Sequence, residues 1–447
     1  MSAIVLGGGV EGLAAAAVLA RAGETVTLVE ARRELGGSAR ILHDTELLRP
    51  WVVEELGLDV QLVPPPPVHG PGGPIEAPVA LAEIIDAIRP FVLSLLDGPA
   101  PLVSSDAALW PLLKPALGFR MLGPSVMMEL LRVAPTCAAD FLAEHTSDPA
   151  LAASMALPAL LHTWMGPRSP SSTTPLLIHE CARGDEVAGG SGALVEALEK
   201  ACVGVTFRTD TVVSGLEVDG SGCHGVRLGE ELLEAETVIS TLGPRRTLLG
   251  LVDPMWLPPL TERDVDCVRL RGCVAKMDID LADPGSIGDR KRLRTASGLD
   301  DIERAFDDVK HRRLPRKPVL DIRVVDGCLS VLAFGAPYEL DGGWSDGARD
   351  GLRQRVLAAL HEAVSGLELE GHRLLTPADL ESEYGLEGGH LLHGELALDQ
   401  LYSLRPTPGL SRHATAIAGL YLGSEGCHPG LASSGASGVF AARAALA

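Results

Sequence analysis

The sequence predicts an α/β protein in which a Rossmann-type dinucleotide-binding domain is interleaved with a mixed α+β substrate-binding domain. Three observations predict it: a strand, a glycine loop and a helix near the amino terminus, a second such unit near the carboxyl terminus, and a glycine-led helix with short strands between them. The 447 residues, of which 46% are hydrophobic and 22% charged, suffice for about two or three packed domains.

The amino-terminal unit carries the strongest signal. We expect an apolar strand at residues 3–6, followed by the glycine loop GGGVEG at 7–12. A helix is expected at 13–22 and a second strand at 25–29. In such a unit Gly7 permits a tight turn, Gly9 lets a diphosphate approach the backbone, and Gly12 lets the helix pack closely on the strand. Glu30 follows the second strand, where a carboxylate accepts hydrogen bonds from ribose hydroxyls. The unit therefore predicts a bound dinucleotide.

A second glycine pair follows within ARRELGGSAR, residues 31–40. This order resembles the FAD-binding oxidoreductases of the amine oxidase and phytoene desaturase superfamily, in which GxGxxG is followed by a G-G motif. The resemblance implies one FAD, held without a covalent bond, and places Arg32, Gly37, Ser38 and Arg40 beside it. That family commonly has an arginine directly after the glycine pair, whereas this chain has Ser38 there. The sequence contains no second strand-linked GxGxxG, which favours FAD alone.

The carboxyl-terminal unit has the order strand, glycine loop, helix, with a strand at 420–422, GSEGCHPG at 423–430, SSGASG at 433–438 and a helix at 439–446. It resembles the C-terminal flavin motif of the phytoene desaturase-like enzymes. The resemblance implies that Glu425 or Ser424 lies near the ribityl chain. It also implies that the helix start at Ser434, with the N–H groups of Gly435 and Ala436, faces the flavin N1/O2 edge, where a helix N-terminus stabilises negative charge.

Two middle segments resemble the same enzymes. The first begins with GGSGAL at 189–194, continues as a helix to 201 and strands at 205–208, 212–218 and 238–241, and ends in GPRR at 243–246. The second is GGHLLHGELALDQL at 388–401, followed by LRP at 404–406. By this resemblance the backbone of Val213 would contact adenine.

The positions of these segments predict how the domains interleave. We expect the FAD-binding domain at 1–72, 184–262 and 402–447, and the substrate-binding domain at 73–183 and 263–401, with proline-rich crossings near 64–74 and 167–175. Apolar helices are expected at 81–96, 119–133 and 150–162. Met121, Met127 and Met128 are interpreted as core packing, or alternatively as a wall for an apolar substrate or a face that touches a membrane.

After the second glycine pair the chain is shorter than its resemblance implies. The family has some ten to fifteen further residues that pass close to the flavin ring, but here residues 41–44 lead almost directly to 47–57. The activity of a phytoene desaturase therefore does not transfer directly. Only 4% of the residues are aromatic, which leaves few side chains to stack on a long polyene.

The functional hypothesis is an FAD-dependent desaturase, dehydrogenase or oxidase that transfers a hydride from an apolar, biosynthetic small molecule to flavin N5. Candidate catalytic or orienting pairs are His393 with Glu395 and Glu425 with His428, and His43, Asp44 and Tyr402 are weaker candidates. Two alternatives stay open: a redox-neutral isomerase or cyclase that uses bound FAD, and a non-catalytic binding protein like the related GDP-dissociation inhibitors. Intact Gly7, Gly9, Gly12 and Glu30 argue against the last.

Composition limits partners and location. With 38 basic and 59 acidic residues the net charge is −21, which disfavours nucleic acid. The eight cysteines have no metal-ligand spacing, so no metal site is predicted. No export signal or membrane-spanning run is visible, so we expect a cytoplasmic protein, leave peripheral membrane contact and the oligomeric state open, and expect a lipophilic small molecule as substrate.

Overall fold

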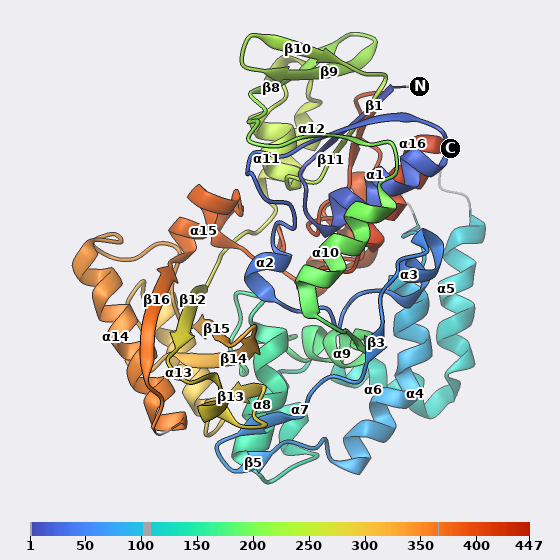
Figure 1. Cartoon of the computed structure of the whole chain (residues 1–447). Coiled ribbons are helices and arrows are strands. Elements are labelled where there is room, and N and C mark those ends of the chain that lie inside the picture. The colour runs from blue at the N-terminus through green and yellow to red at the C-terminus, as the bar shows by residue number, and fades with distance from the viewer. Residues whose placement is uncertain (1, 102–108, 365) are drawn as a thin grey trace.

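The computed structural model describes residues 2–101, 109–364 and 366–447, and contains two main sheets, each covered by helices (Figure 1). The first sheet is parallel and gathers segments that are distant in sequence. Its strands, in spatial order, are β17 (Leu420–Leu422), β11 (Thr237–Ser240), β1 (Ser2–Leu6), β2 (Thr25–Val29) and β7 (Thr206–Arg208). The strands expected at 3–6, 25–29 and 420–422 are thereby confirmed.

Both faces of the parallel sheet are covered, as its mostly buried strands require. On one face lie α1 (Val10–Arg21), α3 (Pro50–Leu56), α10 (Gly190–Ala201) and α16 (Ala436–Leu446), packed around an alanine-rich core. On the other lie α11 (Pro244–Gly250), α12 (Pro259–Asp266) and a small antiparallel sheet of β8 (Gly215–Asp219), β9 (Gly222–Leu228) and β10 (Glu231–Glu234). Helices near the two chain ends, α1 and α16, pack together (Figure 1).

Small residues allow this close packing. A side chain at Gly12 would overlap the carbonyl of Gly7, and one at Gly438 would overlap the carbonyl of Glu11. The strand expected at 212–218 begins only at Gly215, because the preceding residues run beside the end of β2 instead. There Thr211 N–H donates to the Glu30 carbonyl at 3.0 Å.

The second sheet has seven strands and mixed pairing. In spatial order they are β16 (Leu369–Leu375), β12 (Val274–Leu281), β15 (Cys328–Phe334), β14 (Val319–Val325), β13 (Arg292–Arg294), β4 (Val68–Gly70) and β5 (Gly73–Pro74). One face packs its apolar side chains on α14 (Asp346–Ala363). Because side chains alternate, the other face carries Lys276 and Asp278 of β12 and the charged side chains of β13 and β14. The predicted domain boundary at residue 72 falls inside the β4–β5 hairpin, so β4 belongs to this sheet.

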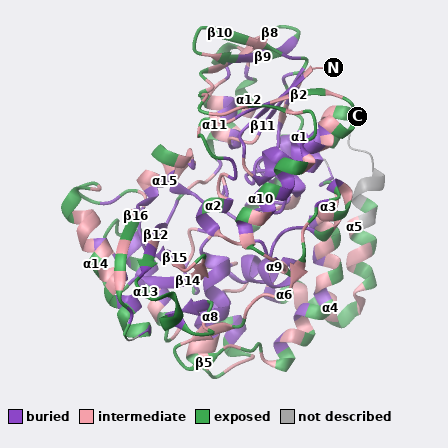
Figure 2. Cartoon of the chain, viewed as in Figure 1, coloured by how far each residue is buried: buried purple, intermediate pink, exposed green. Residues whose placement is uncertain are grey.

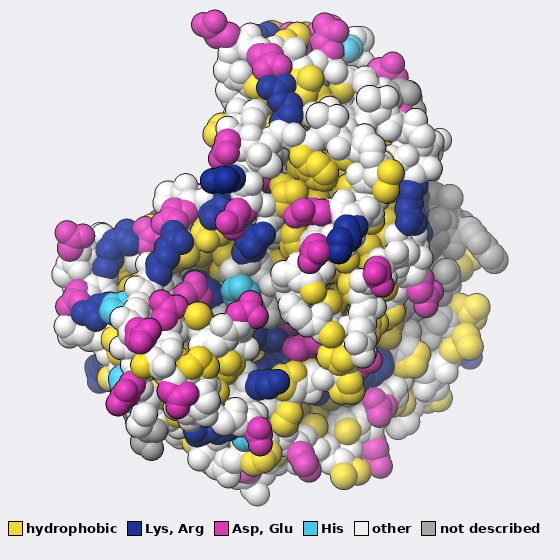
Figure 3. Space-filling view, viewed as in Figure 1, with side chains coloured by type: hydrophobic (Ala, Val, Ile, Leu, Met, Phe, Trp, Pro, Cys, Tyr) yellow, Lys and Arg dark blue, Asp and Glu magenta, His cyan; other side chains and the backbone are white. Residues whose placement is uncertain are grey.

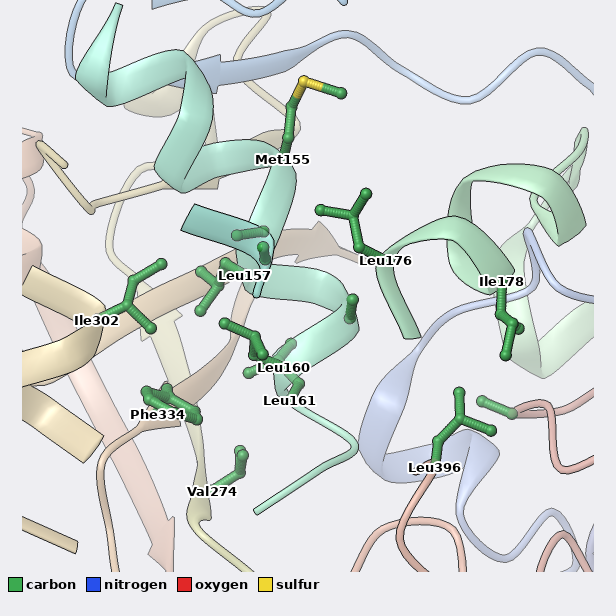
Figure 4. Packing of buried hydrophobic residues seen from close by; sticks show 14 of the residues in the cluster. Met155, Leu157, Leu160, Leu161, Leu176, Ile178, Val274, Ile302, Phe334 and Leu396 are labelled. Carbon is green, nitrogen blue, oxygen red and sulfur yellow. The ribbon is translucent and has the colours of Figure 1, made fainter. Parts of the chain in front are cut away.

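The remaining helices form the apolar part of the second domain. They are α2 (Ala39–Leu42), α4 (Val79–Leu96), α5 (Leu109–Met121), α6 (Gly123–Val133), α7 (Ala138–Ala143), α8 (Pro149–Leu160), α9 (Thr173–Ala182), α13 (Leu299–Lys310) and α15 (Pro377–Tyr384). Figure 4 shows leucines of α8 packed with Ile302 and Phe334 in the largest buried cluster. The expected helices at 81–96 and 150–162 are thus present with slightly different ends.

The helix expected at 119–133 is two helices. Gly123 has a φ of 79°, a left-handed conformation that separates α5 from α6, and Pro124 stands in the first turn of α6. Met121 and Met128 are 80% and 67% exposed, so their interpretation as core packing is wrong. Figure 2 shows the exposed and intermediate colours along α5. Among the described residues no helix is both long and apolar enough to cross a bilayer.

The short segment after α2 ties the two domains together through charge. Glu46 is 1% exposed and receives two hydrogen bonds from Arg292, at 2.9 and 3.0 Å. Arg323 contacts Asp44 at 2.6 Å and Glu186 at 2.9 Å. We call these five residues the interdomain ion cluster. A short strand pair, β3 (Leu62–Val63) with β6 (Glu186–Val187), joins the two chain crossings beside it.

His179 of α9 adds a proton-dependent contact to this cluster. Its ring nitrogens lie 3.6 Å from Glu46 and 3.3 Å from Glu180. Burial alone would lower the pKa of His179, but the two carboxylates outweigh it and raise that pKa to about 9. Because an unfolded histidine has a pKa of about 6.5, the stabilisation is fully present below about pH 6.5 and is lost as the pH rises through about 9.

We therefore expect the free energy of unfolding to fall between pH 6.5 and 9.5 in the wild type, and to fall less in His179→Gln. Urea denaturation at both pH values measures the difference. Parallel pH profiles for the two proteins would contradict the assignment of a charged His179.

Candidate nucleotide-binding groove

A groove lies where strands β1, β2 and β11 end, between the parallel sheet and the end of α15. Its open volume is about 530 Å³. The carboxyl ends of parallel strands are where α/β proteins bind ligands. The groove is lined by Gly7, Gly9, Val10, Glu11, Glu30, Gly37, Ser38, Thr241, Leu242, Arg246, Tyr384, Gly385, Leu386, His393 and Glu425.

Glu30 organises the first glycine loop. Its carboxylate accepts hydrogen bonds from the N–H groups of Gly8, at 2.6 Å, and Arg32, at 2.9 Å. Gly9 precedes α1 without a side-chain cap, so the first N–H groups of the helix point into the groove unpaired by any side chain of the described residues. A Cβ at Gly9 would come no closer than 3.9 Å to any protein atom. The space beside Gly9 is therefore left for a ligand.

The second glycine pair joins this loop. Gly36 N–H donates to the Gly8 carbonyl at 2.8 Å, and a Cβ at Gly37 would meet Gly9 at 3.0 Å. The hydroxyl of Ser38 lies 3.1 Å from both carboxylate oxygens of Glu425. Two glycine loops and the carboxyl-terminal loop therefore meet at one place.

Arg32 and Arg40, both predicted beside the cofactor, are held by other groups. Arg40 is exposed, donates to the Leu35 carbonyl and lies 3.6 Å from Glu34. The guanidinium of Arg32 stacks 3.9 Å from the Tyr384 ring centre and donates to the Glu383 carbonyl at 3.2 Å. Neither arginine lines the groove. Val213 is half-buried against the core of the small antiparallel sheet and does not line it either.

The helix start at residues 434–436 also differs from expectation. The N–H of Gly435 donates to Glu11 at 2.9 Å, the Ser434 hydroxyl donates to the same oxygen at 2.9 Å, and Ala436 N–H donates to the Ser434 hydroxyl. Both N–H groups that were expected to face a flavin are therefore already paired in this structure, that of Gly435 with Glu11 of α1 and that of Ala436 with Ser434. Burial raises the pKa of Glu11 to about 7. The acidic residue within GGGVEG, Glu11, is the feature of the sequence that could have predicted this pairing.

Glu425 faces the groove from the carboxyl-terminal loop. Beyond its contact with Ser38 it accepts a hydrogen bond from Ser433 N–H at 2.8 Å. Burial, together with the neighbouring carboxylate of Glu11, raises the pKa of Glu425 to about 8. Glu425 therefore holds a proton over part of the neutral range.

Of the four residues in the two candidate catalytic pairs, Glu425 and His393 line the groove, whereas Glu395 and His428 do not. His393 packs against Gly243 and Gly426, its Nδ1 has no partner among the described residues, and burial lowers its pKa to about 4. Glu395 is instead paired with Arg269 at 3.1 Å and Arg271 at 2.8 Å. His428 donates to the Gly98 carbonyl and stacks on Phe440.

Arg405 fixes the loops that carry His393 and Glu425. It is fully buried, and burial lowers its pKa to about 10, so it stays charged near neutral pH. Its guanidinium donates to the carbonyl oxygens of Leu392, Gly394, Glu395, Gln400, Glu425 and Cys427. A side chain at Gly430 would overlap it, and Gly430 has a φ of 80°.

Two basic residues beside α2 were missed or ranked low at the level of sequence. Lys276 is 1% exposed, donates to the Ser330 hydroxyl and lies 2.8 Å from Asp278, and burial lowers its pKa. His43 ends α2, and its Nδ1 lies 3.3 Å from the Ser191 hydroxyl. Burial lowers the pKa of His43 to about 4, and Lys276 contributes. Figure 3 shows charged and histidine side chains gathered between α2 and the strands β14 and β15. The sequence feature that could have predicted a buried basic group here is Lys276, a lysine at an inward position of the segment CVAKMDID.

The one cluster of acidic groups with metal-ligand spacing in the described part of the chain is Asp44, Glu46 and Glu186. Arg292 and Arg323 already pair with these carboxylates. The cluster is therefore an ion-pair network.

Comparison with known proteins agrees with this architecture. Residues 5–59 match the family described as "NAD(P)-binding Rossmann-like domain". A rat protein named "Pyridine nucleotide-disulfide oxidoreductase domain-containing protein 2" is 27% identical over 98% of this chain and 91% of its own length. An oxidoreductase from Methanosarcina mazei superposes with a TM-score of 0.61 at 15% identity, covering 98% of this chain and 99% of that one. Putrescine oxidase superposes with a TM-score of 0.60 at 16% identity, covering 100% and 98%.

The chain has the amine oxidase-like fold. The matched Rossmann-like segment contains both glycine loops and Glu30, which form one wall of the groove. The opposite wall comes from Arg246 of α11, from Tyr384–Leu386 at the end of α15 and from His393. The groove is thus closed by segments outside the matched region.

We expect Arg405→Lys to lower the free energy of unfolding by at least about 3 kcal/mol. A lysine has three donors and cannot reach six carbonyl oxygens, and each lost hydrogen bond to a charged group is worth about 1.5–3 kcal/mol. Urea denaturation measures the change. Arg412→Lys is the matched control, because Arg412 reaches a single carbonyl, that of Ala100. Equal effects of the two substitutions would show that the Arg405 network is not a special support.

Proposed function

We propose that this chain is an FAD-dependent oxidoreductase that takes a hydride from a small, mainly apolar molecule. The observation that carries the proposal is the groove itself, where space is kept beside Gly9 at the uncapped start of α1. A helix N-terminus with unpaired N–H groups binds phosphate. Glu30 lies at the end of β2. There its carboxylate can accept hydrogen bonds from ribose hydroxyl groups in addition to those from its two backbone N–H donors.

The residues around the groove suit a ligand longer than a mononucleotide. Glu30 follows β2, whereas Glu425 and His393 come from loops near the carboxyl terminus. Glu425 has the chemistry to bind the hydroxyl groups of a ribityl chain, since its protonated and ionised forms together can donate and accept hydrogen bonds. These residues fit FAD, held without a covalent bond, better than they fit a single nucleotide.

When bound, FAD would accept a hydride from a carbon atom at its N5 position. The chain itself offers neutral groups for the accompanying proton. His393 is uncharged at neutral pH because its pKa is about 4, so it is available as a base. Lys276 is shielded from water and its pKa is lowered, which brings it closer to the range in which an amine can exchange a proton. His43 lies beside it.

For the substrate, the second domain offers an apolar environment, because the side chains of α8 and α9 belong to its buried hydrophobic cluster. The charged face of the second sheet, with Lys276 and Asp278 nearest α2, provides for a polar group at one end. A mainly apolar molecule with one polar end fits both features.

The substitution Gly9→Ala tests the cofactor proposal without disturbing the fold. Gly9 has a φ of −72° and its Cβ would meet no protein atom within 3.9 Å, so the ligand-free protein is expected to keep its Tm. The added methyl would occupy the place of the diphosphate. FAD affinity is therefore expected to fall at least about tenfold, measured by flavin absorbance and fluorescence titration.

Gly250→Ala is the matched control, because a Cβ there meets nothing within 4 Å and the residue lies in α11 away from the groove. A colourless wild-type protein that does not bind added FAD would refute the cofactor. FAD that binds but is never bleached by candidate substrates under anaerobic conditions would instead favour the redox-neutral alternative.

A further inference from the structure

The groove offers little positive charge for the diphosphate of a dinucleotide. Glu11, Glu30 and Glu425 line it, and among the described lining residues Arg246 is the single lysine or arginine. His393 contributes no charge near neutral pH, because its pKa is about 4. A diphosphate brings two further negative charges. A cation is therefore needed in the groove.

Arg246 is placed to supply it. It lies in the first turn of α11, which follows β11, the neighbour of β1 in the sheet, so it stands beside the loop that contains Gly9. Its own hydrogen bonding is weak: Nη1 lies 3.5 Å from the Gly385 carbonyl, and within the described residues no carboxylate pairs with it. The adjacent Arg245 is paired with both Glu387 and Asp266, at 3.0 Å each.

The backbone around Arg246 keeps room for its guanidinium. A side chain at Gly385 would overlap Nη1 of Arg246, and Gly385 has a φ of 68°, which favours glycine. Arg246 also lies close enough to His393 to lower the pKa of that ring. The guanidinium is thus held between the segment after α15 and the groove.

We infer that Arg246 binds the diphosphate of the dinucleotide, across the groove from the start of α1. This inference rests on the proposed function. Arg32 and Arg40, which the resemblance placed beside the cofactor, are both held by other contacts. A guanidinium presents paired N–H donors that match phosphate oxygens, so it supplies geometry as well as charge.

Binding of ADP and of adenosine to the purified full-length chain, dialysed free of flavin, separates this role from others. We expect the wild type to bind ADP more tightly than adenosine. Arg246→Gln is expected to lower the affinity for ADP at least about tenfold. The affinity for adenosine is expected to stay within about twofold of the wild-type value, because adenosine has no phosphate. Isothermal titration calorimetry measures both constants.

Arg245→Gln is the matched control: it removes the same charge from the neighbouring position and is expected to change neither affinity. Gly385→Ala displaces the guanidinium without removing it, so it is expected to lower the affinity for ADP, as Arg246→Gln does. Unchanged ADP binding by Arg246→Gln, or an equal loss for ADP and adenosine, would overturn the inference while leaving the proposed function standing. A wild type that binds neither ligand would overturn both.

Discussion

The buried guanidinium of Arg405 is the contact on which the arrangement of the groove depends. Six backbone carbonyls from three loops converge on it, and no carboxylate of the described residues forms an ion pair with it. Burying an unpaired cation is costly unless its donors are satisfied, so the loops must stay in place around it. Because His393 and Glu425 belong to these loops, the far end of the groove is positioned by a residue that does not line it.

At the near end, two carboxylates organise the backbone: half-buried Glu30 and buried Glu11. Glu30 holds the first glycine loop through its N–H groups, and Glu11 holds the start of α16. Each carboxylate organises backbone that would otherwise be unpaired. The groove is therefore lined by three glutamate side chains and by one arginine, Arg246, that has no carboxylate partner among the described residues. This combination suits a ligand with both hydroxyl groups and phosphates.

Local pattern was sufficient to predict the parallel sheet. The first strand, the glycine loop, the helix and Glu30 are adjacent in sequence, and their spacing reflects contacts within one βαβ unit. The direction of long side chains was not predictable in the same way. Arg32 and Arg40 turn toward Tyr384 and Leu35, and only the tertiary structure brings Tyr384 next to Arg32.

The interdomain ion cluster was equally hidden, because Glu46, Glu186 and Arg292 are far apart in sequence. Residues 44–46 follow α2, and they join the domains through charge. Glu395 shows the same limitation: its motif suggested catalysis, but Arg269 and Arg271 occupy its carboxylate.

A crystal structure of the chain grown with FAD is the most direct test of the groove as the cofactor site. The account predicts electron density for a dinucleotide that runs from Glu30 to His393, with its diphosphate between Gly9 and the guanidinium of Arg246. Density for FAD at another place, or a groove filled by the segment after α15 with no ligand despite saturating FAD, would contradict it.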